Sequence, residues 1–172
     1  MTVPPAPADF LPASPDSLGR ALDALGVPVA KHTHAPLMTV EDSKALRGDL
    51  PGGHCKNLFL KDKKGVLWLV VSLEDARLDM KELKKTIGAA HLSFGKPELL
   101  ADVLGVTPGS VTPFALMSDT ATRVRVVLDR AMLARDPINY HPLINTRTWA
   151  IGADDLVRFI RWTGHEPAIL DL

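Results

Sequence analysis

The sequence predicts a mixed α/β domain, in which helices wrap a mixed β-sheet. Its 172 residues match the length of one domain, and 46% apolar with 23% charged residues is the composition of an ordinary globular protein. Segments with helical and with strand periodicity alternate irregularly along the chain, and tight turns join several of the expected strands. This combination points to a mixed sheet in a single domain.

Residues 1–14 are expected to form a flexible, proline-rich leader, because five of the 14 prolines lie within the first 15 residues. A helix is expected next. Ser14 can cap it, Pro15 suits its first turn and Asp16 places a negative charge at its positive end. Gly26 ends this helix. The predicted domain therefore runs over residues 15–172.

The later elements carry boundary signals of the same kinds. Asp79 with Glu82 forms an acidic capping pair, Thr39 with Asp42 resembles a capping box, and residues 62–65 form a hairpin turn between two apolar strands. The expected strands cover residues 27–33, 54–61, 66–71, 124–128 and 148–151, and the expected helices cover residues 39–48, 79–88, 97–105 and 154–164.

The charges balance overall but are distributed unevenly. Lys and Arg number 20, as do Asp and Glu. The net charge is −3 over residues 1–43, +5 over residues 44–147 and −2 over residues 148–172. The neutral total argues against a protein that coats nucleic acid through a large basic surface. The basic middle part has two open interpretations: solvated turns and helix faces, or a local rim that receives one end of a polyanion.

Two further classes of protein are excluded. No apolar run approaches the roughly 18 to 20 residues of a membrane span, and Met1 to Pro5 lack the basic and apolar parts of a signal peptide. Because Cys55 is the single cysteine, the chain has no internal disulfide, and a reducing cytoplasm is the expected location.

Candidate metal ligands and nucleophiles are few. His32 and His34 share one face of an expected strand, but no third ligand accompanies them and neither CxxC nor HExxH occurs. We therefore predict no metal and no cofactor. His54 and Cys55 are adjacent on a strand and face opposite sides, so the histidine cannot easily activate the thiol. Cys55 is predicted to be a small core residue.

Three polar features interrupt apolar surroundings. Residues 105–114 contain two glycines and two prolines in a stiff loop, whose backbone N–H groups suit a phosphate or a carbonyl oxygen that gains negative charge. Lys56 lies inside an apolar strand, where it must reach solvent, pair or serve a ligand. Residues 140–146 place a His, an Asn and a Thr in one polar stretch. Taken singly, each feature is also compatible with a structural role.

Taken together, these motifs resemble the YbaK/ProX family of aminoacyl-tRNA editing domains, and most closely its free-standing ProX-type members. The likeness covers roughly residues 15–168, and an ordered set of motifs is far more specific than one short motif. The matching segments are His34-Ala35-Pro36 with Thr39-Val40-Glu41, then residues 53–65, Leu92-Ser93-Phe94, residues 104–114 and residues 141–146.

The resemblance implies a compact domain with a curved mixed sheet and a cleft for the 3′ end of a tRNA. It also implies hydrolysis, without a metal, of the ester that joins a wrong amino acid to the terminal ribose. Lys56 matches the family's essential lysine, Asn57 would steady it or the substrate, and Gly109 and Ser110 match the GxxPG loop that would hold the oxyanion. The implied substrate-binding residues are His34, Thr39, His141, Asn145 and Thr146.

The expected activity is trans-editing of mischarged tRNA(Pro), with Ala-tRNA(Pro) as the leading substrate. No side chain is an obvious general base, and within the matched motifs His141 is the only candidate. Water attack assisted by the free ribose hydroxyl of the substrate is therefore favoured. Two alternatives stay open: a deacylase for Cys-, Ser- or Thr-tRNA, and a non-catalytic module that binds tRNA or a synthetase. Action on released tRNA, or after docking to prolyl-tRNA synthetase or an elongation factor, is expected, with no membrane partner.

Overall fold

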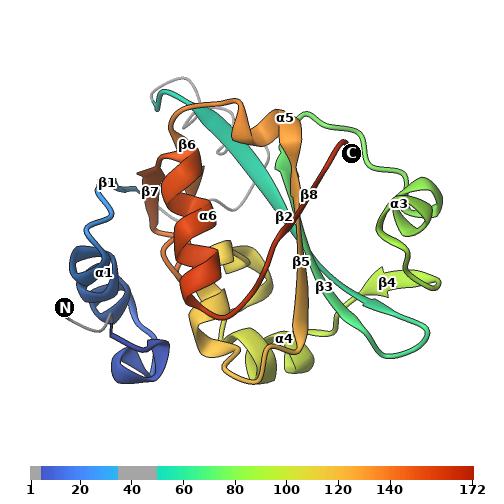
Figure 1. Ribbon diagram of the computed structural model, residues 1–172, viewed down its shortest axis with the longest axis horizontal. Coiled ribbons are helices and arrows are strands. Elements are labelled where there is room, and N and C mark those ends of the chain that lie inside the picture. The colour runs from blue at the N-terminus through green and yellow to red at the C-terminus, as the bar shows by residue number, and fades with distance from the viewer. Residues whose placement is uncertain (1–4, 35–49) are drawn as a thin grey trace.

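A strongly twisted mixed β-sheet is the framework of the chain, as the computed structural model in Figure 1 shows. The structure describes residues 5–34 and 50–172. Within these residues the sheet has eight strands, in the order β1-β7-β6-β2-β3-β5-β8, and β4 pairs with β2 beside this path. The strands are β1 (Val29–Thr33), β2 (Gly53–Asp62), β3 (Leu67–Leu73), β4 (Leu92–Phe94), β5 (Val124–Asp129), β6 (Ile138–Tyr140), β7 (Arg147–Ile151) and β8 (Ala168–Leu170).

Both antiparallel and parallel pairings occur in this sheet. The β2–β3 hairpin is antiparallel from Lys61 opposite Leu67 to Cys55 opposite Leu73. Strands β3, β5 and β8 then continue in parallel, whereas β6, β7 and β1 pair antiparallel to one another. Within the sheet, as far as the described residues show, the β1-β7-β6 part joins the rest through two residue pairs of β2 and β6, beginning at Gly53 opposite Ile138.

The helices begin and end where their capping residues place them. The Ser14 hydroxyl accepts a hydrogen bond from the Ser17 N–H, and the Asp79 carboxylate accepts from the N–H groups at the start of its helix. Gly105 ends another helix at φ 69°, a left-handed conformation that suits glycine. The α-helices are α1 (Pro15–Leu25), α3 (Met80–Ile87), α4 (Pro97–Leu104), α5 (Arg130–Leu133) and α6 (Ala153–Trp162). Three 3-10 helices are η1 (Pro7–Phe10), η2 (Pro108–Ser110) and η3 (Pro113–Ser118).

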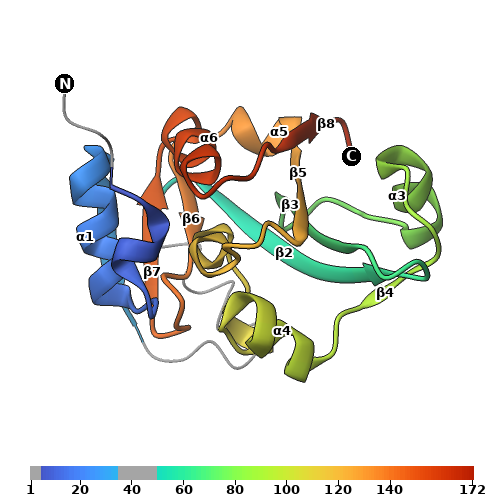
Figure 2. The ribbon, with the colours of Figure 1, turned by 60° about the horizontal axis from the view of Figure 1, so that its bottom comes forward.

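Two apolar clusters cover the two faces of the β2–β3–β5 part of the sheet. The larger cluster joins α1, α4, η3 and α6 to one face, around the fully buried rings of Phe114 and Phe159. The smaller one packs Leu83 of α3 against Leu60 and Val70 on the opposite face. In the view of Figure 2, α6 lies at the top and α4 at the bottom of the molecule. Burial on both faces explains the near-continuous apolar sequence of β3.

The predicted mixed α/β fold, a mixed sheet surrounded by helices, is confirmed. The expected helices that begin near residues 15, 79, 97 and 154 and the five expected strands all occur with shifts of a few residues. The expected helix over residues 39–48 lies outside the described residues. Strands β4, β6 and β8 and the short helix α5 appear in addition to the expected elements.

Part of the proline-rich leader contacts the last helix. The ring of Phe10 in η1 meets Trp162 edge to face at 5.9 Å, and the Trp162 indole N–H donates to the Pro5 carbonyl at 2.5 Å. Among the described residues, no helix has both the length and the apolar character that crossing a bilayer requires.

Candidate functional site

Predicted substrate-binding residues meet at the β1–β7 edge of the sheet. His34 directly follows β1, and its backbone N–H donates to the Thr146 carbonyl at 2.8 Å. Its Nε2 lies 2.8 Å from the Thr148 hydroxyl on β7. The His34 and His141 rings are 6.1 Å apart between centroids. Pairing of β1 with β7 therefore places both histidines and Thr146 in one polar cluster.

His141 is held as a neutral hydrogen-bond acceptor. Its Nδ1 lies 2.9 Å from the Arg147 carbonyl oxygen, which can only accept, so Nδ1 carries the proton. Burial lowers the pKa of His141, and the nearby His34 lowers it too, against the opposing effect of the Arg147 hydrogen bond. At neutral pH the ring is therefore uncharged, with a lone pair on Nε2. Such a nitrogen can accept a proton or a hydrogen bond from a substrate.

The glycine loop adjoins this cluster through Asn145. A Cβ placed on Gly109 would come within 3.4 Å of the Asn145 amide nitrogen, so that side chain lies directly over the exposed glycine. The Ser110 N–H is already engaged, because it donates to the Thr107 carbonyl at 2.9 Å within η2. Ser110 itself is buried. Of the two predicted loop residues, Gly109 is thus the exposed one and Ser110 the buried one.

Lys56 and Asn57 project from opposite faces of β2. Cys55 and Phe59 pack with the larger cluster and Leu58 with the smaller one, so strand alternation places Lys56 on the α3 face. The Lys56 ammonium donates to the Ala76 carbonyl, which follows β3. On the other face, the buried Asn57 Oδ1 has no hydrogen-bond partner among the described residues. A buried amide oxygen without a donor is energetically costly.

The structure therefore joins some of the predicted site residues and separates others. His34, His141, Thr146, Asn145 and Gly109 form one connected group. Lys56 contacts Ala76 instead, and the described contacts do not link it to that group. Thr39 lies outside the described residues.

Two contributors to the cluster were missed from the sequence. The Arg147 carbonyl sets the protonated nitrogen of His141, and the Thr148 hydroxyl contacts His34. One signal was available: Thr148 is a buried hydroxyl at the start of an otherwise apolar strand. The pairing of β1 with β7, which brings His32 opposite Thr148, could not be predicted from either sequence segment alone.

Cys55 is a core thiol, as predicted. It packs against the larger cluster, and burial raises its pKa to about 12, so the thiolate is not populated at neutral pH. The neighbouring His54 turns away, with Nε2 3.1 Å from the Leu50 carbonyl oxygen. Within residues 5–34 and 50–172, no three His, Cys, Asp or Glu side chains are grouped so that they could hold a metal ion.

Comparison with known proteins places these motifs in a family. Residues 34–159 match the profile described as an aminoacyl-tRNA editing domain. A protein from Acetoanaerobium sticklandii named prolyl-tRNA editing protein ProX is 32% identical over 152 residues, which cover 88% of this chain and 93% of that protein. A Bos taurus protein named prolyl-tRNA synthetase associated domain-containing protein 1 is 35% identical over 160 residues, covering 90% of this chain and 93% of its own.

A solved structure gives the same result for the fold. It is described as "a putative trans-editing enzyme for prolyl tRNA synthetase" and superposes with a TM-score of 0.64 at 18% identity, over 100% of this chain and 99% of that one. The family profile covers well over half of the chain, and two relatives above 30% identity span nearly all of it. The chain therefore belongs to the aminoacyl-tRNA editing domain family.

Proposed function

We propose that this chain is a trans-editing hydrolase that deacylates mischarged tRNA(Pro), with Ala-tRNA(Pro) as its main substrate. The carrying observation is the neutral His141, whose Nε2 lone pair sits in one cluster with His34 and the Gly109 loop. Hydrolysis of an aminoacyl ester needs an acceptor for a proton or for the amino group, and donors for the carbonyl oxygen. Membership of the editing family supplies the substrate class.

The proposed reaction is attack of water on the ester carbonyl carbon. A tetrahedral intermediate forms, the bond to the ribose oxygen breaks, and that oxygen takes up a proton. The products are the free amino acid and a tRNA with its terminal diol restored. The neighbouring ribose hydroxyl assists the proton transfers, and the backbone at Gly109 donates to the developing oxyanion. Because the Ser110 N–H already donates to Thr107, Ser110 acts by shaping the loop.

Lys56 has a positioning or charge-stabilising part in this proposal. Its ammonium has a carbonyl partner, Ala76, which a stronger anionic partner can replace. The terminal phosphate or the acyl oxygen of the substrate would be such a partner. Asn57 projects from the other face of β2 with its amide oxygen buried, so in this proposal it would steady the strand that carries Lys56.

Selectivity for alanine would be steric. A site that admits an alanyl group and is too small for proline spares the correctly charged tRNA. Because one methylene changes binding by only about 1–3 kcal/mol, such sieving is effective when a second site performs it after charging. The proposed setting is the cytoplasm, on released tRNA or in association with prolyl-tRNA synthetase or an elongation factor.

Two other functions remain candidates on specific grounds. The small cluster would also fit cysteinyl, seryl or threonyl esters, whose side chains are close in size to alanine. A non-catalytic module is the second candidate, since the Bos taurus relative is named only as an associated domain.

One assay separates these functions. Purified tRNA(Pro) charged with radiolabelled Ala, Cys, Ser, Thr or Pro is incubated with the protein, and loss of the acyl group is followed over time. Fast release of Ala with Pro retained supports the proposal, and preference for another residue reassigns the substrate. Binding of tRNA without any release would overturn catalysis and support the module.

A further inference from the structure

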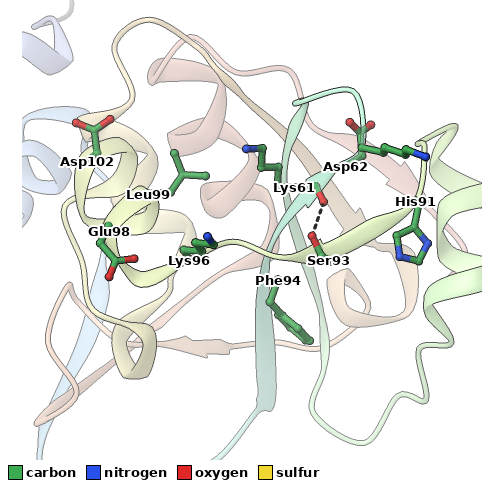
Figure 3. Close-up of a pocket in the computed structure, with 10 residues that line it drawn as sticks. Lys61, Asp62, His91, Ser93, Phe94, Lys96, Glu98, Leu99 and Asp102 are labelled. Atoms are coloured by element: carbon green, nitrogen blue, oxygen red, sulfur yellow. Dashed lines mark hydrogen bonds between the residues drawn. The ribbon is translucent and has the colours of Figure 1, made fainter.

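A second concave surface lies away from the histidine cluster, beside strand β4 and the start of α4. It is a cavity of 690 Å³. Its lining includes Lys61 and Lys63 of the β2 hairpin, His91, Phe94 of β4, Lys96 and Glu98. Figure 3 shows Lys61, His91 and Lys96 around Ser93. The Ser93 hydroxyl donates to the Lys61 carbonyl at 3.3 Å. The proposed reaction assigns this cavity no part.

Three lysines and three carboxylates line this cavity, but not all of these carboxylates are free to neutralise the lysines. Lys61, Lys63 and Lys96 are all exposed. Asp62 is buried and turned into the hairpin, where its carboxylate accepts from the N–H groups of Lys64, Val66 and Ala90. Asp102 has Arg123 as an ion-pair partner at 3.5 Å. Asp62 and Glu98 have no cationic partner among the described ion pairs, so the three lysines exceed by one the carboxylates that no cation neutralises.

Phe94 adds an aromatic surface to this positive cavity. Its side chain is 64% exposed, and it is the one exposed large hydrophobic side chain among the described residues. Figure 3 shows the ring turned to the opposite side of β4 from Ser93, at the edge of the cavity. One exposed aromatic residue needs no special explanation by itself. At the edge of a cavity lined by three lysines, it adds the aromatic surface that sites for single-stranded nucleic acid use for base stacking.

The backbone that carries Phe94 is fixed in place. The Gly95 N–H donates to the Phe59 carbonyl at 2.9 Å, and a Cβ on Gly95 would lie 2.3 Å from the Phe59 ring. Only glycine permits this approach, so the core side chain Phe59 sets the position of the strand end. Because this backbone is fixed, less conformational entropy is lost when a base stacks on the Phe94 ring than if the strand end were mobile.

We propose that this cavity binds an unpaired segment of RNA, with one base stacked on Phe94 and the adjoining phosphates against Lys61, Lys63 and Lys96. The identity of that RNA as the 3′ strand of a tRNA rests on the proposed function. This site would bind the tRNA at nucleotides other than the one that carries the aminoacyl group.

Direct binding tests the stacking. Fluorescence anisotropy gives the Kd for uncharged tRNA(Pro), for a single-stranded RNA ending in CCA and for a blunt RNA duplex. Phe94→Leu, which keeps an apolar side chain but no π face, should weaken the first two about 5- to 150-fold, the range that ~1–3 kcal/mol per stacked base corresponds to. Phe94→Trp should keep the wild-type Kd. Unchanged binding by Phe94→Leu, or a loss confined to the duplex, would overturn the proposal.

Salt dependence tests the phosphate contacts. Lys96→Gln should lower the slope of log Kd against log salt concentration by about 1, because one phosphate contact is removed. Arg158→Gln on α6 removes one exposed charge outside the cavity and should leave the slope as it is. Equal slopes for both variants and the wild type would refute the lysine contacts.

The binding experiments and the deacylation assay test the two proposals separately. A protein that binds RNA through Phe94 but releases no amino acid would contradict the proposed function and keep this inference. Deacylation of Ala-tRNA(Pro), together with RNA binding that Phe94→Leu leaves unchanged, would support the proposed function and contradict this inference.

Discussion

The His165 Nε2 and the Asp119 Oδ2 meet at 2.8 Å in the protein interior, although 46 residues separate them in the sequence. Their side chains are 3% and 2% exposed. The other ring nitrogen of His165 contacts the Thr163 hydroxyl at 2.8 Å, and Asp119 also accepts from the N–H groups of Arg123 and Val124. This network fastens the turn before β5 to the residues that follow α6.

Breaking this pair should destabilise the fold strongly. His165→Ala leaves a buried carboxylate without its imidazole partner, and we expect the free energy of unfolding to fall by about 3–5 kcal/mol in urea denaturation. Arg161→Gln is the matched control, since it removes an exposed ion pair with Glu166 and should cost less than ~1 kcal/mol. A loss for His165→Ala no larger than that of the control would contradict a stabilising role.

Acid should act through the same carboxylate. Burial alone would raise the pKa of Asp119, but the hydrogen bond from His165 and those from the Val124 and Arg123 N–H groups lower it. The folded-state pKa is therefore below the ordinary value near 3.9, and the unfolded chain binds the proton more readily. The stabilisation is present above about pH 3.9 and disappears as the pH falls through the folded-state value. Asp119→Asn should flatten this part of the stability–pH curve; an unaltered curve would assign acid sensitivity to other groups.

The pH dependence of deacylation should report His141. Burial lowers its pKa from the ordinary value near 6.5, so the neutral, accepting ring persists into mildly acidic solution. We expect kcat/KM to fall only below about pH 6.5, as the ring becomes protonated. His141→Asn keeps an N–H donor near the Arg147 carbonyl but removes Nε2, so it should lower kcat/KM about 10²- to 10⁴-fold and abolish the acidic limb. Persistence of that limb in the variant would exclude His141 as its source.

Lys56 should matter for turnover far more than for folding. Lys56→Ala removes one hydrogen bond to the Ala76 carbonyl, worth about 1–3 kcal/mol of stability for a charged donor, and keeps the apolar strand. The rate of Ala-tRNA(Pro) deacylation should fall at least about 10²-fold. Single-turnover rates and thermal denaturation, measured on one preparation, separate the two effects. A wild-type rate would remove Lys56 from the mechanism.

Chelation should leave deacylation unchanged, because the proposed reaction takes its proton acceptor and oxyanion donors from the chain and the substrate. Rates are compared before and after dialysis against EDTA, with Mg²⁺ restored to keep the tRNA folded. Strong inhibition that Zn²⁺ reverses would overturn the prediction that no metal takes part.

The helices were predictable because their boundary signals are local. Ser14, Asp79 and Gly105 act within one turn of the helix that they begin or end. Strands β4, β6 and β8 have three residues each, too few to show a period, and they exist through pairing with distant strands. Short strands of this kind are invisible to a pattern read along one stretch of sequence.

The candidate site also combines residues that are close in the sequence with residues that only the fold brings together. The sequence already placed His141, Asn145 and Thr146 in one segment, and the structure adds His34 because β1 pairs with β7. The Lys56 contact with Ala76 depends on how the chain turns after β3, 20 residues later, so residue types alone could not predict it.

The short pairing between β2 and β6 determines how two parts of the sheet are joined. Two strand residue pairs, reinforced by the Asn139 amide donating to the Pro51 and Gly53 carbonyls at 3.0 Å, form the seam between two panels of the sheet. One panel carries the histidines and the other carries Lys56. A Cβ on Gly52 would lie 2.2 Å from the Pro137 carbonyl oxygen, so the seam has no room for a side chain there. The larger apolar cluster also joins the two panels, because it contains Ile138 and Trp149 of one panel and Phe59 of the other. The strand junction and this core together therefore set where His141 lies relative to Lys56.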